Sequence, residues 1–279
     1  MKDKTIPVPS SPRRAWHGAT GLLCCHMCRL RRQHNHDSSS HPRSKTAGYS
    51  KSICNKFSEG IFAVYKPKGP TSHDVVDYIR KSSGIKKVGH AGTLDPLAVG
   101  VLVIGIGREA TKKLNEAVCA EKEYIASICL GMESVTDDAE GPISVVKVEK
   151  IPARKDIQEM LNDFLGEILQ TPPAYSAVKI RGKSAYKFAR KGKVVALLQR
   201  KVFVKEIEFL EYKWPHLKIR VVTGPGVYIR AIARDMGRKL GTGGYIQDLE
   251  RTRIGNFTAR DAISFIGLIE FLKTRTRKR

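Results

Sequence analysis

One carboxylate is a candidate for chemistry because small and turn-forming residues surround it. Residues 89–100 read GHAGTLDPLAVG, and an apolar run follows directly. Gly89 and Gly92 allow the backbone to bend sharply, and Pro96 fixes the chain direction just after Asp95. The pattern predicts a rigid loop that presents the Asp95 carboxylate at the edge of a hydrophobic core, where active-site groups are often carried. An Asp-Pro turn with a solvated carboxylate explains the same pattern, so the segment alone leaves both interpretations open.

The charge balance indicates a polyanionic partner. The 279 residues include 50 Lys and Arg against 27 Asp and Glu, a net charge of +23. Residues 1–58 hold eleven bases and two acids, which leaves 39 bases and 25 acids, a net of +14, for the remainder. RNA, DNA and acidic membrane surfaces all fit this charge. No run of residues is long and apolar enough to span a bilayer, so we expect no membrane segment.

Four short segments occur in a particular order around Asp95. They read KPKGPTS at 66–72, KEY at 122–124, GVYIR at 226–230 and LERT at 249–252. In this order they closely resemble the pseudouridine synthases of the bacterial tRNA pseudouridine-55 family, TruB, from about Gly60 to Phe257. Several separated motifs in the right order are far more specific than any one of them.

The resemblance implies an isomerase that makes pseudouridine. This reaction breaks the bond from ribose to N1 of uracil, rotates the base and rejoins it through C5. It involves no redox change and no net hydrolysis, so we expect neither a cofactor nor a metal ion. By resemblance Asp95 is the nucleophile, since a carboxylate is already ionised near neutral pH. Attack on the sugar, attack on the base and a route through an unsaturated sugar all stay open.

The same resemblance assigns the other catalytic and binding residues. Arg230 is expected to pair with Asp95 and to hold it ionised. Tyr124 is similar to the tyrosine that stacks on the target uracil and helps to remove the C5 proton. Tyr228 matches a second pocket aromatic, and Leu249 a hydrophobic wall. Without the resemblance, core packing explains these last three residues equally well.

Two further residues have expected roles beside the chemistry. The target uridine must be flipped out of a folded RNA loop, and His90 resembles the residue that enters the space left behind. Lys66 resembles a residue that packs beneath the site. The acid-rich turn at 136–141 ends in Glu140 where many relatives have Asp. We expect phosphate contacts, and therefore salt-dependent binding, from Lys68, Lys86, Lys87, Lys179, Arg181, Lys183, Lys187, Arg190 and Lys191.

Hydrophobic periodicity predicts an α+β fold, with a mixed, largely antiparallel sheet flanked by helices. Thr71 is a predicted N-cap for a helix that ends near Gly84. Strands are expected at 61–65, 101–106, 123–130, 143–148, 202–212 and 217–222. Further helices are expected at 154–165, 228–240 and 262–272. The resemblance implies the pseudouridine synthase fold, and about two dozen residues after its last motif are too few for the C-terminal PUA domain of many relatives. This length argues against the guide-RNA-dependent branch.

The sequence divides into three parts. Residues 1–58 are rich in Ser, Arg, His and Pro without periodicity, and we interpret them as a disordered leader, a transit peptide or the product of a misplaced start codon. Residues 59–272 form the predicted catalytic domain, and residues 273–279 a basic tail. We expect a cytoplasmic protein, or one in an organelle matrix if the leader is a transit peptide.

The cysteines show no disulfide framework. Cys119 and Cys129 lie in apolar, core-like surroundings, which suits reduced thiols in an intracellular protein. A zinc site is conceivable from the ligand types of Cys25, Cys28, His34 and His36, but a second cysteine pair is lacking.

Residues 105–110 offer a rival function. Gly105, Gly107 and Ala110 follow an apolar strand and precede a helix, as in a dinucleotide-binding turn, with Glu133 as the ribose ligand. Against this interpretation, Glu109 would compete for the positive helix end that a pyrophosphate needs.

These observations predict a stand-alone, monomeric tRNA pseudouridine synthase that acts on the T-arm, without an obligatory protein partner. The alternatives are the same chemistry on another RNA, such as an mRNA stem-loop, a non-catalytic tRNA chaperone, and a dinucleotide-dependent oxidoreductase.

Overall fold

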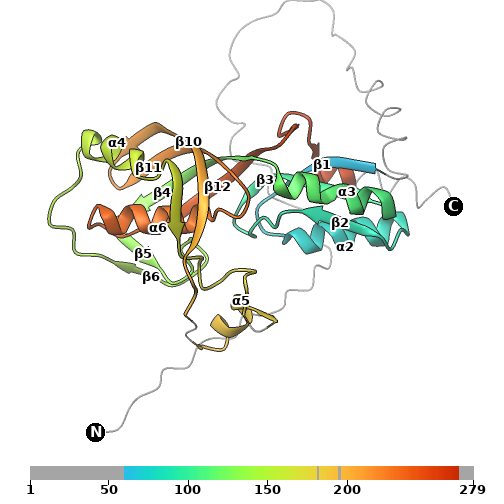
Figure 1. The fold of residues 1–279 in the computed structure, drawn as a ribbon, viewed down its shortest axis with the longest axis horizontal. Helices are drawn as coiled ribbons and strands as arrows, with labels where there is room; N and C mark the ends of the chain where they lie inside the picture. Colours follow the sequence, from blue (N-terminus) through green and yellow to red (C-terminus); the bar gives the residue numbers. More distant parts are fainter. Residues whose placement is uncertain (1–59, 181, 194–195, 270–279) are drawn as a thin grey trace, which may run out of the picture. The chain divides into compact units, whose positions relative to one another are not determined.

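The computed structural model describes residues 60–180, 182–193 and 196–269, and Figure 1 labels most of its helices and strands. The main sheet contains β1 (Gly60–Lys66), β2 (Val88–Ala91), β3 (Val99–Ile106), β4 (Lys122–Leu130), β7 (Gly166–Gln170), β10 (Arg200–Lys213), β11 (His216–Thr223), β12 (Gly244–Ile254), β13 (Phe257–Thr258) and β14 (Ile263–Ser264). Two small hairpins pair β5 (Met132–Ser134) with β6 (Ile143–Val145) and β8 (Lys179–Ile180) with β9 (Lys183–Ser184). The helices are α2 (Ser72–Ser83), α3 (Arg108–Cys119), α4 (Arg154–Asn162), α5 (Ala185–Ala189) and α6 (Ile229–Lys239).

The main sheet is mixed and largely antiparallel, as predicted. Its strand order is β14-β1-β3-β12-β4-β11-β10-β7, with β2 paired to β3 and β13 to β12. The parallel pairs are β1 with β14 and β3 with β12, and the other neighbours run antiparallel. The short parallel contact between β3 and β12 joins the two halves of the sheet.

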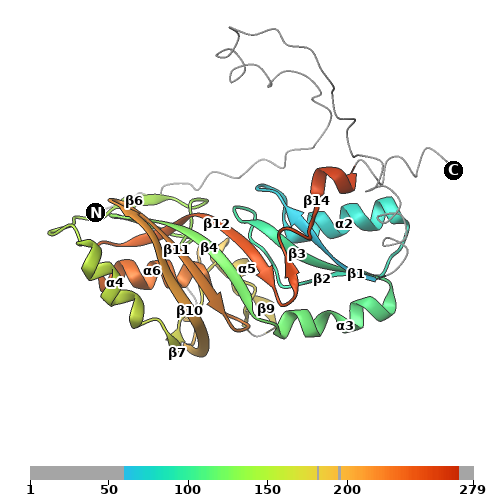
Figure 2. The same ribbon diagram turned by 90° about the horizontal axis from the view of Figure 1, so that it is seen from above.

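In one half, α2 and α3 cover opposite faces of β1, β2 and β3 (Figure 2). Because strand side chains alternate between faces, Val64 and Leu102 pack against α2. Ala63 and Val103 pack against α3. The α2 helix begins as the sequence predicts: Thr71 accepts a hydrogen bond from the Asp74 amide in a capping box, and Gly84 ends the helix with φ 73°.

In the other half, α4 and α6 pack on one face of the sheet. Ile157 of α4 and Ile232 of α6 belong to the same buried cluster as Ile128 of β4 and Ile219 of β11. The residues just before β3 extend this cluster, since Leu97 is also a member. The segment that contains Asp95 is therefore anchored in the larger core.

Several sequence predictions need correction. Residues 262–272 were expected to be helical throughout, but 263–264 form β14 and the helix starts at Phe265. Cys119 is exposed rather than buried, whereas Cys129 is buried. The predicted leader at 1–58, its candidate zinc ligands and the tail at 273–279 lie outside the described residues.

The strand β12 was missed altogether, although it lies next to both β3 and β4. Its sequence, GYIQDLERTRI, contains several charged residues, so it lacks the simple apolar alternation of a half-buried strand. One of those charged side chains, Arg251, is buried with 1% exposure. A charged residue usually marks the exposed face of a strand, so the buried Arg251 makes the sequence pattern indicate the wrong face.

The topology excludes the dinucleotide-binding interpretation. That motif requires two parallel strands joined by a crossover helix. Here β12 separates β3 from β4, and because β12 is parallel to β3 but antiparallel to β4, these two strands run in opposite directions.

Within the described residues, no helix is long and apolar enough to cross a membrane.

The close approach of α6 to β12 gives a stability prediction. A Cβ on Gly237 would lie 2.1 Å from the carbonyl carbon of Gly243 and 2.3 Å from the Gly244 nitrogen. Replacing glycine by alanine inside a helix normally stabilises it by about 1 kcal/mol. We expect the opposite for Gly237→Ala, a loss of about 2–3 kcal/mol, because the backbones must separate.

Urea unfolding of wild type, Gly237→Ala and Gly224→Ala would measure this effect. At Gly224 the nearest atom to an added Cβ is 3.5 Å away, which is ordinary contact, so this control should change little. A more stable Gly237→Ala variant would contradict the packing argument.

Candidate active site

A cavity of about 690 Å³ brings five of the seven predicted site residues together. Asp95 enters it from the loop at residues 92–98, which we call the Asp95 loop. Tyr124 comes from β4, Leu249 from β12, and Tyr228 and Arg230 from the start of α6. Lys66 and His90 are not among the lining residues.

Lys66 lies beneath the Asp95 loop, as expected, and is fully buried. Its ammonium donates hydrogen bonds to the carbonyls of Pro67 at 2.9 Å, Pro70 at 2.9 Å and Pro96 at 3.3 Å. Burial lowers the pKa of Lys66 to about 8, and the negative charge of Asp95 opposes this shift. Lys66 therefore ties the start of the chain's KPKGP segment to the residue that follows Asp95.

A second buried cation, Arg251, holds the other side of the Asp95 loop. Its guanidinium donates to the carbonyls of Gly92 at 3.1 Å, Thr93 at 3.3 Å and Val101 at 2.8 Å. The sequence places Arg251 inside the LERT motif but did not suggest a role for it. The only sign of a role was that Arg251 is a charged residue within an expected motif. The sequence did not reveal which carbonyls it binds.

The side chain of Ser72 completes the support of the loop. Its hydroxyl accepts a hydrogen bond from the Leu94 amide at 2.8 Å and donates one to the Leu94 carbonyl at 3.0 Å. Together with Lys66 and Arg251, it satisfies backbone groups of a segment that belongs to no helix or strand. The peptide groups on both sides of Asp95 are thus held by buried side chains.

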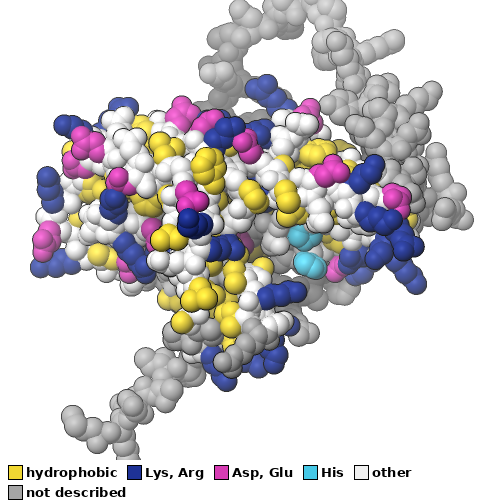
Figure 3. All heavy atoms as spheres, in the orientation of Figure 1, with side chains coloured by type: hydrophobic (Ala, Val, Ile, Leu, Met, Phe, Trp, Pro, Cys, Tyr) yellow, Lys and Arg dark blue, Asp and Glu magenta, His cyan; other side chains and the backbone are white. Residues whose placement is uncertain are grey.

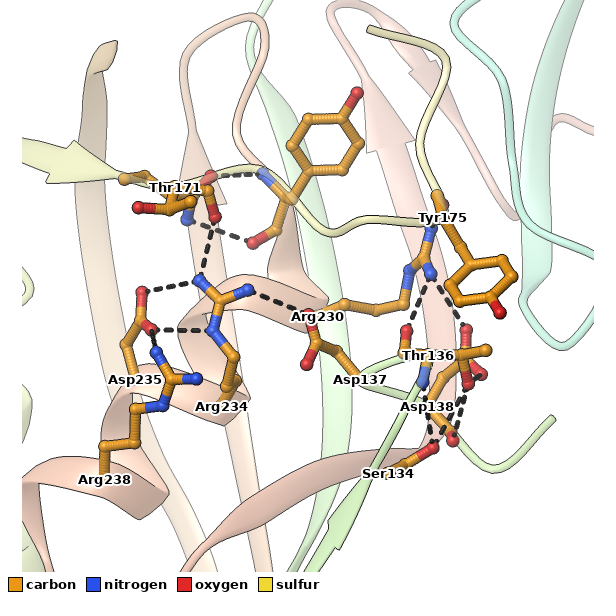
Figure 4. A network of polar contacts seen from close by, with 12 residues as sticks. Ser134, Thr136, Asp137, Asp138, Thr171, Tyr175, Arg230, Arg234, Asp235 and Arg238 are labelled. Atoms are coloured by element: carbon orange, nitrogen blue, oxygen red, sulfur yellow. Dashed lines mark hydrogen bonds and ion pairs between the residues drawn. The ribbon is translucent and has the colours of Figure 1, made fainter. Parts of the chain in front are cut away.

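Arg230 and Asp95 form the expected ion pair. The Nε of Arg230 lies 3.0 Å from Oδ2 of Asp95, although it does not point along a hydrogen-bond direction. The same guanidinium lies 3.2 Å from Oδ2 of Asp138 and donates to the carbonyls of Thr136 and Tyr175, each at 2.9 Å. Figure 4 shows Arg230 reaching these groups from α6.

The turn at 136–141, here called the acidic turn, supports Arg230. Oδ1 of Asp138 accepts hydrogen bonds from the Thr136 hydroxyl at 2.6 Å and from the Glu140 amide at 3.0 Å. Asp137 lies 2.9 Å from the guanidinium of Arg234, one helical turn after Arg230. Burial raises the pKa of the Glu140 carboxyl, and the charges of Asp138 and Asp95 raise it further. The Glu-for-Asp difference therefore lies within electrostatic reach of Asp95.

The carboxyl of Asp95 is partly open to the cavity, with 34% of its side chain exposed. Burial nevertheless raises its pKa above the ordinary value. The charge of Arg230 lowers this pKa, while that of Asp138 raises it. The two neighbours therefore act in opposite directions on the ionisation of Asp95.

The two aromatic residues come from different elements, Tyr124 from β4 and Tyr228 from the start of α6. Tyr124 is 6% exposed and pairs in register with Arg251 across β4 and β12. The backbone of Tyr228 is held by Gln170, whose amide accepts from the Tyr228 N–H at 2.9 Å and donates to its carbonyl at 3.1 Å. The guanidinium of Arg200 lies 5.0 Å from the centre of the Tyr228 ring.

His90 does not line the cavity itself but contacts a residue that does. Its ring meets that of His73 edge to face, with ring centres 5.5 Å apart, and His73 lines the cavity. Burial lowers the pKa of His90 to about 4, so the imidazole is neutral at physiological pH. The sequence did not single out His73, because its place depends on how α2 packs beside β2.

Some of the other expected contacts can be located. Lys68 is paired with Asp248 at 3.1 Å, and Arg181 lies outside the described residues. Over the ranges that the structure describes, no three His, Cys, Asp or Glu residues lie close enough together to hold a metal ion.

Two family models match this chain. Residues 80–229 match the N-terminal domain of the TruB family pseudouridylate synthases, and residues 230–277 match the tRNA pseudouridylate synthase B C-terminal domain. A tRNA pseudouridine synthase B from Desulfotalea psychrophila is 44% identical over 218 residues, which cover 76% of this chain and 89% of the relative. The enzyme of the same name from Parabacteroides distasonis is 43% identical over 219 residues, covering 76% and 93%.

Solved structures show the same fold. The chain is similar to one in a Cbf5-Nop10-Gar1 complex, with a TM-score of 0.61 and 31% identity over 81% of this chain and 58% of that one. It is also similar to a chain in an H/ACA RNP bound to a substrate RNA containing 2′-deoxyuridine, with a TM-score of 0.58 and 29% identity over 78% and 55%. The chain thus spans less than three fifths of these solved chains. With its α+β fold, its motifs in order and its matched family models, the chain belongs to the TruB family of pseudouridylate synthases.

Proposed function

We propose that this chain is a tRNA pseudouridine synthase, an isomerase that converts the T-loop uridine, conventionally position 55, into pseudouridine. The observation that carries the proposal is the cavity that joins Asp95, Tyr124 and Arg230. Family membership supports the reaction type, and the names of the relatives support tRNA as the substrate. The protein acts on tRNA without a guide RNA or partner protein.

The reaction needs a nucleophile that is rigidly placed and ionised. Asp95 attacks the ribose or the base, or starts a route through an unsaturated sugar, and the N1–C1′ bond breaks. The released base rotates, C5 bonds to C1′, and any bond that Asp95 has formed breaks, which regenerates the carboxylate. The proton then leaves C5, and N1 carries a proton in the product. Arg230 holds the carboxylate in its charged form, and Tyr124 stacks on the uracil and assists removal of the C5 proton.

The target base must first leave its loop. Flipping costs a few kcal/mol of stacking and pairing, and a cavity of about 690 Å³ provides room for the extruded base. Neutral His90 contacts His73 of the cavity lining, and it is our candidate for the residue that enters the space left in the RNA. The net charge of +23 attracts the phosphates.

Replacing the nucleophile tests the proposal most directly. We expect purified Asp95→Asn to bind tRNA within about threefold of wild type, yet to release no tritium from tRNA labelled at uridine C5, because loss of the carboxylate removes the reacting group. Wild type should release one equivalent per tRNA without any added RNA or protein.

Tritium release by the wild-type protein separates the alternative functions. Tight tRNA binding without release by wild type would favour a chaperone or another RNA substrate. Equal release by Asp95→Asn and wild type would remove Asp95 from the chemistry.

The pH dependence of turnover follows from the environment of Asp95. A carboxylate must be ionised to attack, so kcat/KM falls as the pH drops through the raised pKa of Asp95. Removing the negative charge of Asp138 lowers the pKa of Asp95, and Asp138→Asn should therefore move the acid limb to lower pH. Profiles of kcat/KM on T-arm RNA between about pH 5 and 8 measure the shift.

Asp235→Asn is a matched control for this profile. Asp235 pairs with Arg234 at 2.9 Å, on the part of the network farther from Asp95, and should leave the acid limb in place. An acid limb that moves to higher pH in Asp138→Asn would contradict the assigned cause.

A substitution of Arg251 tests whether this residue positions the Asp95 loop. Arg251 binds the three carbonyls through three different nitrogens. Lysine keeps the charge but carries all its donors on one nitrogen and cannot reproduce that spacing, so Arg251→Lys should lower kcat by about 10- to 100-fold. The affinity for tRNA should change by less than about threefold, since the loop is displaced rather than the RNA surface.

Arg253→Lys, at the more exposed end of β12, should keep normal kcat. Thermal unfolding of both variants checks that they fold. A kcat for Arg251→Lys equal to that of wild type would show that the hydrogen bonds of Arg251 do not position Asp95.

A further inference from the structure

One wall of the cavity comes from a segment that the proposed chemistry does not use. Tyr175, Ser176, Ser184 and Tyr186 all line the cavity, and residues 175–186 include the β8–β9 hairpin and the start of α5. We call this stretch, residue 181 apart, the 175–186 wall. Figure 3 shows hydrophobic and basic side chains lying together over the α5 region of Figure 1.

Tyr186 has the features of a base-stacking platform. The side chain is 46% exposed although it is a large aromatic. Its ring meets that of Tyr175 edge to face, with centres 6.1 Å apart. The guanidinium of Arg190 lies 5.7 Å from the Tyr186 ring centre, and Arg190 is exposed. An aromatic face beside an accessible cation suits a nucleotide, which has both a flat base and a phosphate.

A buried hydroxyl next to this platform has unused hydrogen-bonding capacity. Ser176 is 4% exposed, and its Oγ has no hydrogen-bond partner among the described residues. Buried polar groups are normally paired. Because Ser176 also lines the cavity, a polar atom of a bound nucleotide would satisfy it.

The wall is directly attached to the candidate catalytic pair. The carbonyl of Tyr175 accepts a hydrogen bond from Arg230 at 2.9 Å, and Arg230 contacts Asp95 at 3.0 Å. A nucleotide held against the wall therefore lies beside the position of the flipped uridine, not at a remote RNA-binding surface.

We propose that Tyr186 stacks on the base of the nucleotide next to the flipped uridine, and that the Ser176 hydroxyl hydrogen-bonds to that nucleotide. This inference rests on the proposed flipping of the target. When the uridine leaves the loop, its chain neighbour loses a stacking partner, and the Tyr186 ring replaces it. Stacking on the protein thereby offsets part of the cost of flipping.

A cycle of enzyme and RNA variants tests the stacking. Wild type and Tyr186→Ala are each combined with three T-arm stem-loops: the unmodified RNA, and RNAs with an abasic site directly 5′ or 3′ of the target uridine. On the unmodified RNA we expect Tyr186→Ala to raise Kd by about 5- to 150-fold. On one of the abasic RNAs the same substitution should have almost no effect, because the base that it stacks on is already absent.

Conservative and matched variants complete the cycle. Tyr186→Phe should retain the affinity of wild type, since stacking needs the ring and not the hydroxyl. Ser176→Ala should weaken binding of unmodified RNA while leaving thermal stability unchanged or higher, because its hydroxyl has no partner among the described residues. Leu210→Ala, a half-exposed residue of β10 outside the cavity lining, should match wild type throughout.

The outcomes separate this inference from the proposed function. Turnover of the unmodified stem-loop by wild type establishes the substrate, independently of Tyr186. If Tyr186→Ala then loses equal affinity for all three RNAs, or loses none, the stacking inference is overturned. A loss that disappears only with one abasic RNA confirms it and identifies which neighbour is bound.

Discussion

The buried guanidinium of Arg230 is the interaction on which the candidate site depends. It is 5% exposed and contacts two carboxylates and two carbonyls, from the Asp95 loop, the acidic turn and the 175–186 wall. Burying a charge is costly unless it is paired and hydrogen-bonded, and loss of one partner leaves the charge uncompensated. Three segments that are distant in the sequence are therefore held against α6 by a single side chain.

The Asp95 loop has a second, related constraint. A loop that enters the core carries backbone carbonyls that have no hydrogen-bond partner in a helix or sheet, and such groups must find other donors. Lys66 and Arg251 supply them from opposite sides, as buried cations whose donors are directed at main-chain oxygens. Their positive charge also lowers the pKa of Asp95. Structural support and electrostatic support thus come from the same two residues.

The junction of the two half-sheets explains why Arg251 can do this. The parallel register pairs Val99 with Glu250 and Gly100 with Arg251. A Cβ on Gly100 would lie 2.2 Å from the Arg251 carbonyl oxygen, and Gly100 has a φ of 107°. Only glycine permits this approach. The turn residues around Asp95 therefore shape the loop. Gly100 also lets β12 approach closely enough for Arg251 to bind the loop carbonyls.

The sequence by itself determined the family and the local structure of those elements that have clear caps or clear apolar alternation. Thr71 and Gly84 bound α2 because capping is a matter of neighbouring residues, and alternation identified β4, β10 and β11 for the same reason. Asp95 and Arg230 were paired only through resemblance, since the 134 intervening residues carry no local signal of contact. The roles of Arg251, the acidic turn and the 175–186 wall were decided by tertiary structure. Their partners are backbone carbonyls and side chains from distant segments, and hydrophobic periodicity reports which face is buried, not which polar groups meet there.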